Sequence, residues 1–268
     1  MVEKPLLELR NVSKTYDNGF RAVKEVSYSI DRGMLVGLIG PNGCGKSTMM
    51  KCINRIHPTT SGDILVNGES VLNRSPGELA KVISNVPAEL NTSFGLTVAE
   101  TVMMGRYPHS THLWWESEKD ESFTEEALHK FGVSSLKDRF LHTLSSGERQ
   151  RVLIAKAYVQ EPKLMLVDEP TSHLDMRYKL EVMEYLNAMV KKDMSILIAE
   201  HDISLMARYC DLCIIMKEGS LFRIGPPKEI ITSDLIEEVY GVSASVGFDN
   251  DGELFVLPKR YKTVRGSI

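Results

Sequence analysis

The sequence lacks any apolar run long enough to cross a lipid bilayer. Its longest apolar stretches are Met34–Ile39, Leu164–Val167 and Ile196–Ala199, whereas a membrane-spanning helix needs about 20 predominantly apolar residues. The first ten residues, MVEKPLLELR, also lack the apolar core of a secretory signal. We therefore expect the protein to stay in the cytosol, where any link to a membrane comes through a partner.

The chain also has little excess charge and few cysteines. A formal net charge of −4, without a long basic run, argues against a nucleic-acid-binding surface. Four cysteines do not suggest a disulfide framework in a chain of 268 residues. Cys210 and Cys213 form a CxxC pair, but no second pair or histidine cluster completes a zinc site. We expect Cys213 to be a buried strand residue.

One glycine-rich stretch carries a clear chemical signal. The segment GPNGCGKST follows the apolar run Met34–Ile39 and precedes apolar residues at helical spacing. Strand, glycine-rich loop and helix are the context in which this pattern forms a phosphate loop. Its backbone N–H groups and the positive end of the helix favour phosphate groups. The pattern predicts a nucleoside triphosphate site in which Lys46 reaches the outer phosphates and Ser47 ligates Mg²⁺. The expected nucleotide-contacting residues are Gly40, Pro41, Asn42, Gly43, Cys44, Gly45, Lys46, Ser47 and Thr48.

The N-terminal part has the pattern of an antiparallel sheet. Leu6–Tyr16 and Val23–Ile30 alternate apolar and polar residues on either side of a turn, and Asn67-Gly68 between apolar runs predicts a hairpin. Tyr16 lies just before the turn. Its position alone leaves open whether the ring stacks on a base or is an ordinary half-exposed strand tyrosine.

The rest of the chain reads as an α/β core interrupted by helices. Helical patterns dominate from about Ser93 to Lys163. After this stretch the core resumes, with strands and helices in alternation. This alternation predicts a mostly parallel sheet with an inserted helical subdomain at about 93–163. We expect the nucleotide-binding core at 1–225, ending near Gly225-Pro226-Pro227, and a short C-terminal extension at 226–268. The predicted helices are Thr97–Gly105, Lys119–Phe131, Ser145–Gln160, Leu180–Lys191 and Ile203–Tyr209. The predicted strands of the resumed core are Leu164–Asp168, Ser195–Ala199 and, as the last strand, Cys213–Met216. We expect His112–Glu121 to be a loop that leads into the second of these helices.

Two adjacent acids end a buried strand of this core. Four apolar residues, Leu164–Val167, lead directly into Asp168 and Glu169. A carboxylate at such a strand end can hold Mg²⁺, usually through water, beside Ser47. Glu169, one residue on, is placed to accept a proton from an attacking water. The alternative is a solvated loop start, which the neighbouring phosphate loop disfavours.

A helix start supplies the most specific resemblance. Ser145 and Glu148 fit a capping box. The surrounding stretch LSSGERQ is also similar to the LSGGQ signature of ATP-binding cassette (ABC) proteins, from which Ser146 and Glu148 depart. With the other motifs in the family's order, the chain resembles the ATPase subunit of an ABC transporter over nearly its whole length. The resemblance implies a P-loop NTPase fold with an N-terminal antiparallel β subdomain, two bound ATP molecules with Mg²⁺, and a head-to-tail homodimer.

The resemblance also implies roles for single residues. Tyr16 matches the aromatic residue that stacks on adenine, and Ser145 and Gly147 match those that cap the γ-phosphate of the other subunit's ATP. Asp175 belongs to a loop that crosses the dimer interface. Glu169 matches the catalytic base and His201 the switch histidine.

One family position does not match. ABC ATPases carry a glutamine between the core and the helical subdomain, which senses Mg²⁺ and the membrane partner. Here the segment reads Asn85-Val86-Pro87-Ala88-Glu89, and Ala88 takes the expected position. Either Glu89 substitutes by a one-residue shift, or water completes the metal shell. The departure concerns coupling to a partner more than ATP binding itself.

The stretch Gly105–His109 and the later Val239–Val242 are similar to sequences of importers for ferric siderophores, haem and vitamin B12. This similarity implies integral membrane permease subunits as partners at the cytoplasmic face of the membrane and, indirectly, an extracytoplasmic substrate-binding protein. Other interpretations are a soluble ABC ATPase, a phosphate-loop GTPase or kinase, and a regulatory module with a decayed ATPase. The single cassette without a sustained heptad run disfavours the first, LSSGERQ and His201 disfavour the second, and the intact Lys46, Asp168, Glu169 and His201 disfavour the third.

Overall fold

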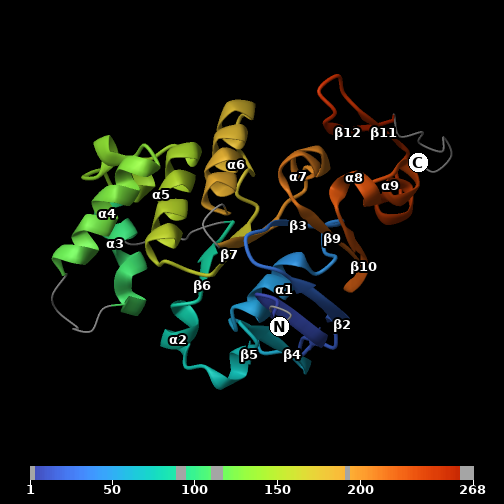
Figure 1. The fold of residues 1–268 in the computed structure, drawn as a ribbon, viewed down its shortest axis with the longest axis horizontal. Coiled ribbons are helices and arrows are strands. Elements are labelled where there is room, and N and C mark those ends of the chain that lie inside the picture. Colours follow the sequence, from blue (N-terminus) through green and yellow to red (C-terminus); the bar gives the residue numbers. More distant parts are fainter. Residues whose placement is uncertain (1–3, 89–94, 110–116, 191–193, 260–268) are drawn as a thin grey trace.

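A computed structural model describes residues 4–88, 95–109, 117–190 and 194–259. Two sheets form the centre of the molecule, and a small hairpin lies near the C-terminal end (Figure 1). The larger sheet has the strand order β10-β9-β3-β8-β7-β6, in which β10 alone is antiparallel to its neighbour. The strands of this sheet are β3 (Leu35–Ile39), β6 (Ile83–Val86), β7 (Leu164–Asp168), β8 (Ser195–Ala199), β9 (Leu212–Lys217) and β10 (Ser220–Gly225).

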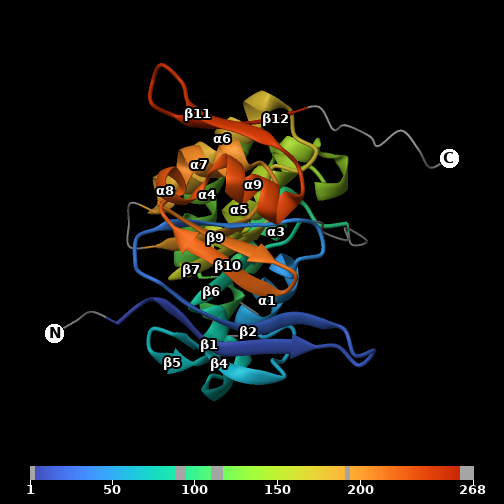
Figure 2. The same ribbon diagram turned by 90° about the vertical axis from the view of Figure 1, so that its right-hand side faces the viewer.

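The second sheet is antiparallel and has the order β2-β1-β4-β5. It lies on one side of the larger sheet, with the phosphate-loop helix α1 (Lys46–Ile53) packed between the two (Figure 2). The turn at Asn67-Gly68 joins β4 to β5, which confirms the predicted hairpin. The strands of this sheet are β1 (Leu7–Thr15), β2 (Arg21–Ile30), β4 (Ser61–Val66) and β5 (Glu69–Ser70).

Helices make up most of the described chain between residues 95 and 160. Three α-helices form this part, as predicted, and two of them start with a reciprocal capping box at Thr97 and Ser145. The helices here are α3 (Val98–Met103), α4 (Glu118–Lys130) and α5 (Ser146–Val159), with short 3₁₀ turns η2 (Met104–His109), η3 (Ser134–Leu136) and η4 (Leu141–Thr143). Part of the predicted loop at 112–121 lies outside the described residues, and α4 already begins within it, at Glu118.

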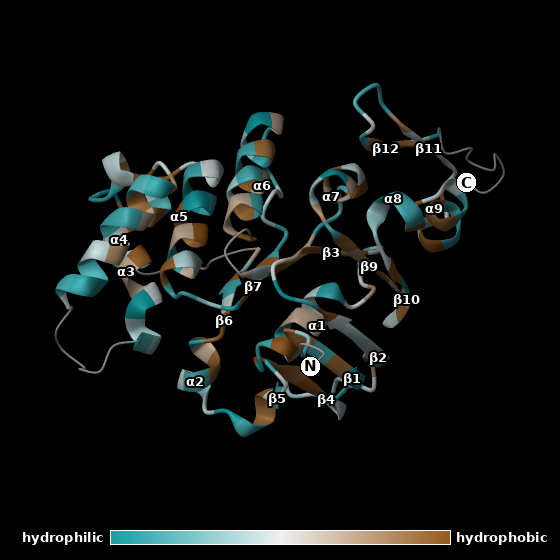
Figure 3. Cartoon of the chain, viewed as in Figure 1, coloured by the Kyte–Doolittle hydropathy of each residue, from teal (hydrophilic) through white to brown (hydrophobic). Residues whose placement is uncertain are grey.

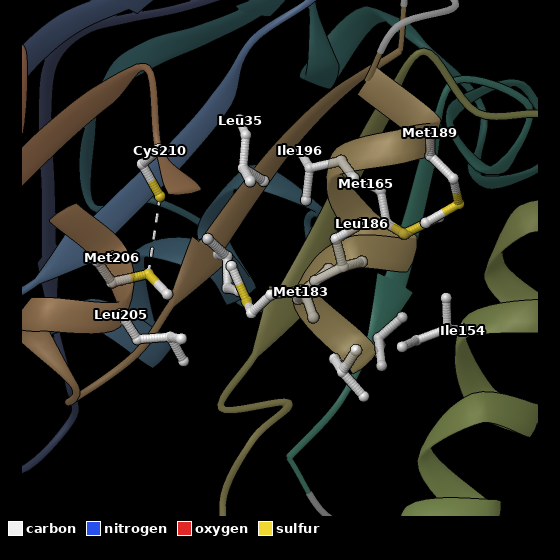
Figure 4. Packing of buried hydrophobic residues seen from close by; sticks show 14 of the residues in the cluster. Leu35, Ile154, Met165, Met183, Leu186, Met189, Ile196, Leu205, Met206 and Cys210 are labelled. Atoms are coloured by element: carbon white, nitrogen blue, oxygen red, sulfur yellow. Dashed lines mark hydrogen bonds between the residues drawn. The ribbon is translucent and has the colours of Figure 1, made fainter. Parts of the chain in front are cut away.

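Burial explains why the central strands are so apolar. Alternate residues of a strand point to opposite faces of a sheet, so Leu164 and Leu166 join the hydrophobic cluster on the α1 side, whereas Met165 and Val167 join the cluster on the other side. Helix α6 (Met176–Val190) covers this second face, and Figure 4 shows Met183, Leu186 and Met189 beside Met165 and Ile196. Figure 3 shows hydrophobic colour along β3 and β9 and largely hydrophilic colour on α4.

Several boundaries differ from the sequence prediction. Helix α6 starts at Met176 rather than Leu180, because the Asp175 carboxylate accepts a hydrogen bond from the backbone N–H of Tyr178 (3.0 Å) and caps the first turn. The sequence analysis did not predict β6, helix α2 (Pro76–Ala80) or the 3₁₀ turn η1 (Val71–Asn73), all of which are short.

The prediction that the strand at Cys213–Met216 is the last one was wrong. This strand, β9, is followed by β10 and, further along, by a two-stranded antiparallel sheet. Helix α7 (Ile203–Tyr209) contacts its strand β12, where the Ser204 hydroxyl accepts a hydrogen bond from the Val256 N–H (3.0 Å). The C-terminal elements are α8 (Pro227–Ile230), α9 (Ser233–Tyr240), β11 (Ala244–Phe248) and β12 (Leu254–Pro258). Among the described residues, no helix is long and apolar enough to cross a membrane.

Candidate nucleotide-binding site

The phosphate loop connects the buried strand β3 to helix α1. Gly45 takes φ +106°, and a Cβ there would lie 2.3 Å from the carbonyl oxygen of Ala22 in β2. Gly40 is equally confined, because its Cβ would lie 2.2 Å from the carbonyl oxygen of Met216 in β9. Glycine is therefore required at both ends of the loop, where the backbone passes directly against neighbouring strands.

Helix α1 begins without a side-chain cap on its first turn. Its leading N–H groups are thus available to an external acceptor, which suits the phosphate oxygens of a nucleotide. Cys44 is buried, and burial raises the pKa of its thiol despite the nearby Lys46 ammonium. This agrees with a small residue packed into a tight loop.

Lys46 is held inside its own loop. The residue is only 5% exposed, and its ammonium group donates hydrogen bonds to the backbone oxygens of Gly40 (2.7 Å) and Pro41 (3.3 Å). A buried ammonium needs such acceptors to offset the loss of hydration. Phosphate oxygens would be stronger acceptors than these carbonyls because they are charged.

Asp168 and Ser47 meet beside the loop. The Ser47 hydroxyl donates a hydrogen bond to the Asp168 carboxylate at 3.3 Å. Burial raises the pKa of Asp168, although the Ser47 hydrogen bond opposes this rise and the neighbouring Glu169 charge adds to it. A hydroxyl and a single carboxylate fit Mg²⁺, which takes few protein ligands and keeps waters and phosphate oxygens around it. The described residues contain no cluster of three or more His, Cys, Asp or Glu side chains that would form an all-protein metal cage.

Glu169 and His201 form a close pair next to this site. The His201 Nε2 atom lies 2.6 Å from a Glu169 carboxylate oxygen, and the Ser172 hydroxyl donates to the other oxygen at 3.1 Å. Burial acts to raise the pKa of Glu169, but the His201 and Ser172 contacts outweigh it and lower the pKa. Glu169 also takes φ +47°, a conformation uncommon outside glycine and one that tends to occur at functional sites.

The sheet topology explains why Asp168, Glu169 and His201 come together. Strands β7 and β8 are parallel neighbours in which Asp168 pairs with Ala199, so the residues that follow them emerge at the same edge. The N–H of Glu169 donates to the Ala199 carbonyl (2.9 Å). Strand β3 lies on the other side of β8 and delivers the phosphate loop to that edge.

Tyr16 lies against the phosphate-loop helix. Its hydroxyl is 3.1 Å from the Thr48 hydroxyl, and its ring meets the His57 ring edge to face at 5.7 Å between centroids. The ring is therefore positioned from one side by α1. The base-stacking role that the resemblance implies for Tyr16 stays a prediction.

The helix starts at Ser145 and Asp175 have local structural partners. The Ser145 hydroxyl accepts a hydrogen bond from the Glu148 N–H, while the Glu148 carboxylate accepts from the Ser145 N–H and hydroxyl (2.9 and 2.8 Å). Gly147 faces the Tyr178 ring, which a Cβ would approach to 3.1 Å. Within the described chain, no hydrogen bond or ion pair joins Ser145, Gly147 or Asp175 to the phosphate loop.

The remaining positions divide between the described and undescribed parts of the chain. Ala88 follows strand β6 and offers no polar side-chain group, whereas Glu89, its proposed substitute, lies outside the described residues. One polar pair at the site, Thr171 and Glu200, was not predicted from the sequence. A glutamate directly before His201, at the end of an apolar strand, was the available signal.

The site combines three features: a phosphate loop, an acid pair at the end of a buried parallel strand, and a histidine at the end of the neighbouring strand. Together they define a nucleotide-binding ATPase fold of the P-loop class. The chain belongs to the ABC transporter family, whose family model matches residues 23–172. The mostly parallel sheet, the N-terminal antiparallel sheet and the helical part confirm the predicted fold class.

The chain is similar to curated ATP-binding proteins. It is 36% identical over 232 residues to the cobalamin import ATP-binding protein BtuD of Halobacterium salinarum, in an alignment that covers 86% of this chain and 58% of that protein. It thus spans less than two thirds of that relative. It is 35% identical over 228 residues to the iron(3+)-hydroxamate import ATP-binding protein FhuC of Bacillus subtilis, with 85% of each chain covered.

Among solved structures, the chain is similar to the ATP-binding cassette MJ0796 in a dimeric post-hydrolysis state bound to ADP and Pi. The TM-score is 0.74 at 28% identity, and the alignment covers 82% of this chain and 98% of the cassette.

Proposed function

We propose that the chain is the ATP-binding and ATP-hydrolysing subunit of an ABC importer. The observation that carries this proposal is the close contact between Glu169 and His201 beside the Ser47–Asp168 pair. This contact supports a base and a second polar group next to the proposed triphosphate and Mg²⁺ site. The relatives described as cobalamin import and iron(3+)-hydroxamate import ATP-binding proteins support an importer. Iron-siderophore, haem or cobalamin would be the class of cargo, with haem resting on the sequence resemblance alone.

Binding would begin with the phosphate loop. The free N–H groups at the start of α1 would donate to the phosphates, and Lys46 would exchange its two backbone carbonyls for phosphate oxygens. Tyr16 would stack on the base. Ser47 and Asp168 would hold Mg²⁺, which supplies charge neutralisation on the phosphates when it is bound.

Hydrolysis would use Glu169 as the general base. A glutamate carboxylate is ionised at neutral pH, so that Glu169 can accept the proton of a water. The water oxygen bonds to the γ-phosphorus, the bond to the leaving ADP oxygen breaks, and inorganic phosphate departs. His201, already in contact with Glu169, would orient the base and contact the γ-phosphate.

Two copies would close head to tail over two ATP molecules. Ser145 and Gly147 of one copy would then cap the γ-phosphate held by the other, and Asp175 would lie at the interface. The dimeric state of the similar cassette supports this arrangement. Closure and reopening would drive permease subunits, which hold the chain at the cytoplasmic face of the membrane and work with an extracytoplasmic substrate-binding protein. Residues 1–225 would form the ATPase domain and 226–268 its extension.

Mixing two inactive variants tests the head-to-tail site. Lys46→Ala removes the phosphate-loop ammonium, and Ser145→Asp places a charge against the γ-phosphate while aspartate still caps the helix. Because a mixed dimer pairs the intact loop of one copy with the intact signature of the other, we expect an equal mixture to recover about a quarter of the wild-type ATPase rate.

Ser145→Asn is the uncharged control for the charge that Ser145→Asp introduces, since asparagine also caps the helix. A mixture no more active than its separate components would contradict the head-to-tail proposal. A wild-type chain that binds no ATP would overturn the proposed function as a whole.

A further inference from the structure

A buried carboxylate lies directly behind the Glu169–His201 pair. Glu200 is only 3% exposed and occupies the first position after strand β8. One of its carboxylate oxygens accepts hydrogen bonds from the backbone N–H and the hydroxyl of Thr171, at 2.9 and 2.6 Å. Its other oxygen accepts from the backbone N–H of His201 at 3.0 Å. A buried carboxylate with three donors is well satisfied, because charged acceptors make the stronger hydrogen bonds.

These contacts close a ring of hydrogen bonds between two loops. Glu169 contacts the His201 ring, the His201 backbone contacts Glu200, and Glu200 contacts Thr171. Thr171 is followed by Ser172, whose hydroxyl returns to Glu169. The exposed pair and the buried carboxylate thereby both join the loop after β7 to the loop after β8, beside the Glu169 N–H bond to Ala199 at the end of β8.

The burial of the two contacts differs sharply. The His201 side chain is 39% exposed, whereas Thr171 is 1% exposed and Glu200 3%. Water competes with hydrogen bonds of exposed groups far more than with those of buried groups. Together with the Glu169 N–H bond to the Ala199 carbonyl, the buried contact is therefore able to hold the backbone of the base loop in place if the exposed pair separates.

The base loop also needs such support. Glu169 and His173 both take positive φ values, +47° and +63°. Residues with side chains hold these conformations only where the surrounding structure fixes them. Thr171 lies midway between the two, and its backbone N–H and hydroxyl are both held by Glu200.

We propose that Glu200 is a positioning residue for ATP hydrolysis, which fixes the backbones of Thr171 and His201 so that the Glu169 carboxylate and the His201 ring stay in register. Glu200 does not touch the nucleotide in this role. It links the base to the segment Ser172–Asp175, which the family resemblance places at the dimer interface. The inference rests on the proposed ATPase function.

The test uses Glu200→Gln and Thr171→Val, with Thr171→Ser as the matched control for the threonine. In Glu200→Gln only one side-chain atom, the amide oxygen, can accept hydrogen bonds. The amide NH₂ then faces either the His201 N–H or the Thr171 donors, and the hydrogen bonds on that side are lost. We expect kcat to fall about tenfold, the cost of one lost bond to a buried charged group, while the Kd for ATP measured at equilibrium stays within about twofold. Thr171→Val should lower kcat similarly, and Thr171→Ser, which keeps the hydroxyl, should restore it.

Thr124→Val is the control for burial, because Thr124 is a buried threonine of α4 whose hydroxyl contacts only the Met103 sulfur among the described residues. It should leave kcat unchanged. A Glu200→Gln variant with wild-type kcat, or a loss of ATP affinity equal to the loss of kcat, would overturn the positioning role. If Glu200→Gln does not fold, a lower kcat for Thr171→Val than for Thr171→Ser supports the proposal, and equal values or the reverse order overturn it. A wild-type chain without ATPase activity would instead refute the proposed function.

Discussion

Two glycines of the phosphate loop permit a quantitative test of how tightly the loop is packed. Gly45→Ala forces a side chain into φ +106°, where its Cβ would lie 2.3 Å from the Ala22 carbonyl oxygen. Gly43→Ala is the matched control, because Gly43 also has a positive φ, +76°, but a Cβ there would have no atom within 4 Å. Both changes carry the conformational cost of positive φ, about 1–2 kcal/mol.

Only Gly45→Ala adds a steric cost. Strand β2 or the loop must shift to accommodate the methyl group, which costs about 1–3 kcal/mol when a well-packed region is overfilled. The free energy of unfolding should therefore fall by about 2–5 kcal/mol for Gly45→Ala and by about 1–2 kcal/mol for Gly43→Ala. Urea unfolding without nucleotide measures both. Equal losses for the two variants would show that the loop is not pressed against β2 and would refute the reasoning.

Two further outcomes follow from single contacts. Tyr16→Phe keeps the ring and removes only the hydroxyl near Thr48, so ATP should bind within about threefold of wild type. Tyr16→Ala should weaken ATP binding by about 5- to 150-fold, because base stacking contributes about 1–3 kcal/mol. Calorimetry distinguishes the two variants, and equal losses would exclude stacking. Burial acts to raise the pKa of Asp120, but hydrogen bonds from Ser117 and Arg106 outweigh it and lower the pKa. The stability that Asp120 contributes is therefore present above about pH 4 and lost as the pH falls through the pKa of Asp120 in the folded protein. The free energy of unfolding measured in urea should depend less on pH below about pH 4 in Asp120→Asn than in the wild type. An unchanged pH dependence would contradict this assignment.

The phosphate loop and the acid pair could be predicted because their physics is local. Gly40–Thr48 signals its own turn, and Leu164–Asp168 signals its own burial and its polar end. The three helices between residues 95 and 160 were also predicted, and the capping box at Ser145 was visible in the sequence; the structure adds a second capping box at Thr97.

Other features depend on contacts between distant segments and could not be read from the sequence. Thr171 and Glu200 are 29 residues apart and meet only because β7 and β8 are neighbours. The short strand β6 was missed because its place at the edge of the large sheet is set by pairing with β7. The start of α6 was missed because the resemblance assigned Asp175 to the dimer interface, whereas in the structure Asp175 also caps the helix.

The measurement that tests the account most directly is ATP hydrolysis by the purified chain compared with Glu169→Gln. Glutamine keeps the size of the side chain and its contact to Ser172 but cannot accept the proton of the attacking water. We predict that the variant binds ATP as well as the wild type, forms a stable ATP-dependent dimer and hydrolyses at least about a hundredfold more slowly. Hydrolysis at the wild-type rate would contradict the assignment of Glu169 as the base and with it the proposed mechanism.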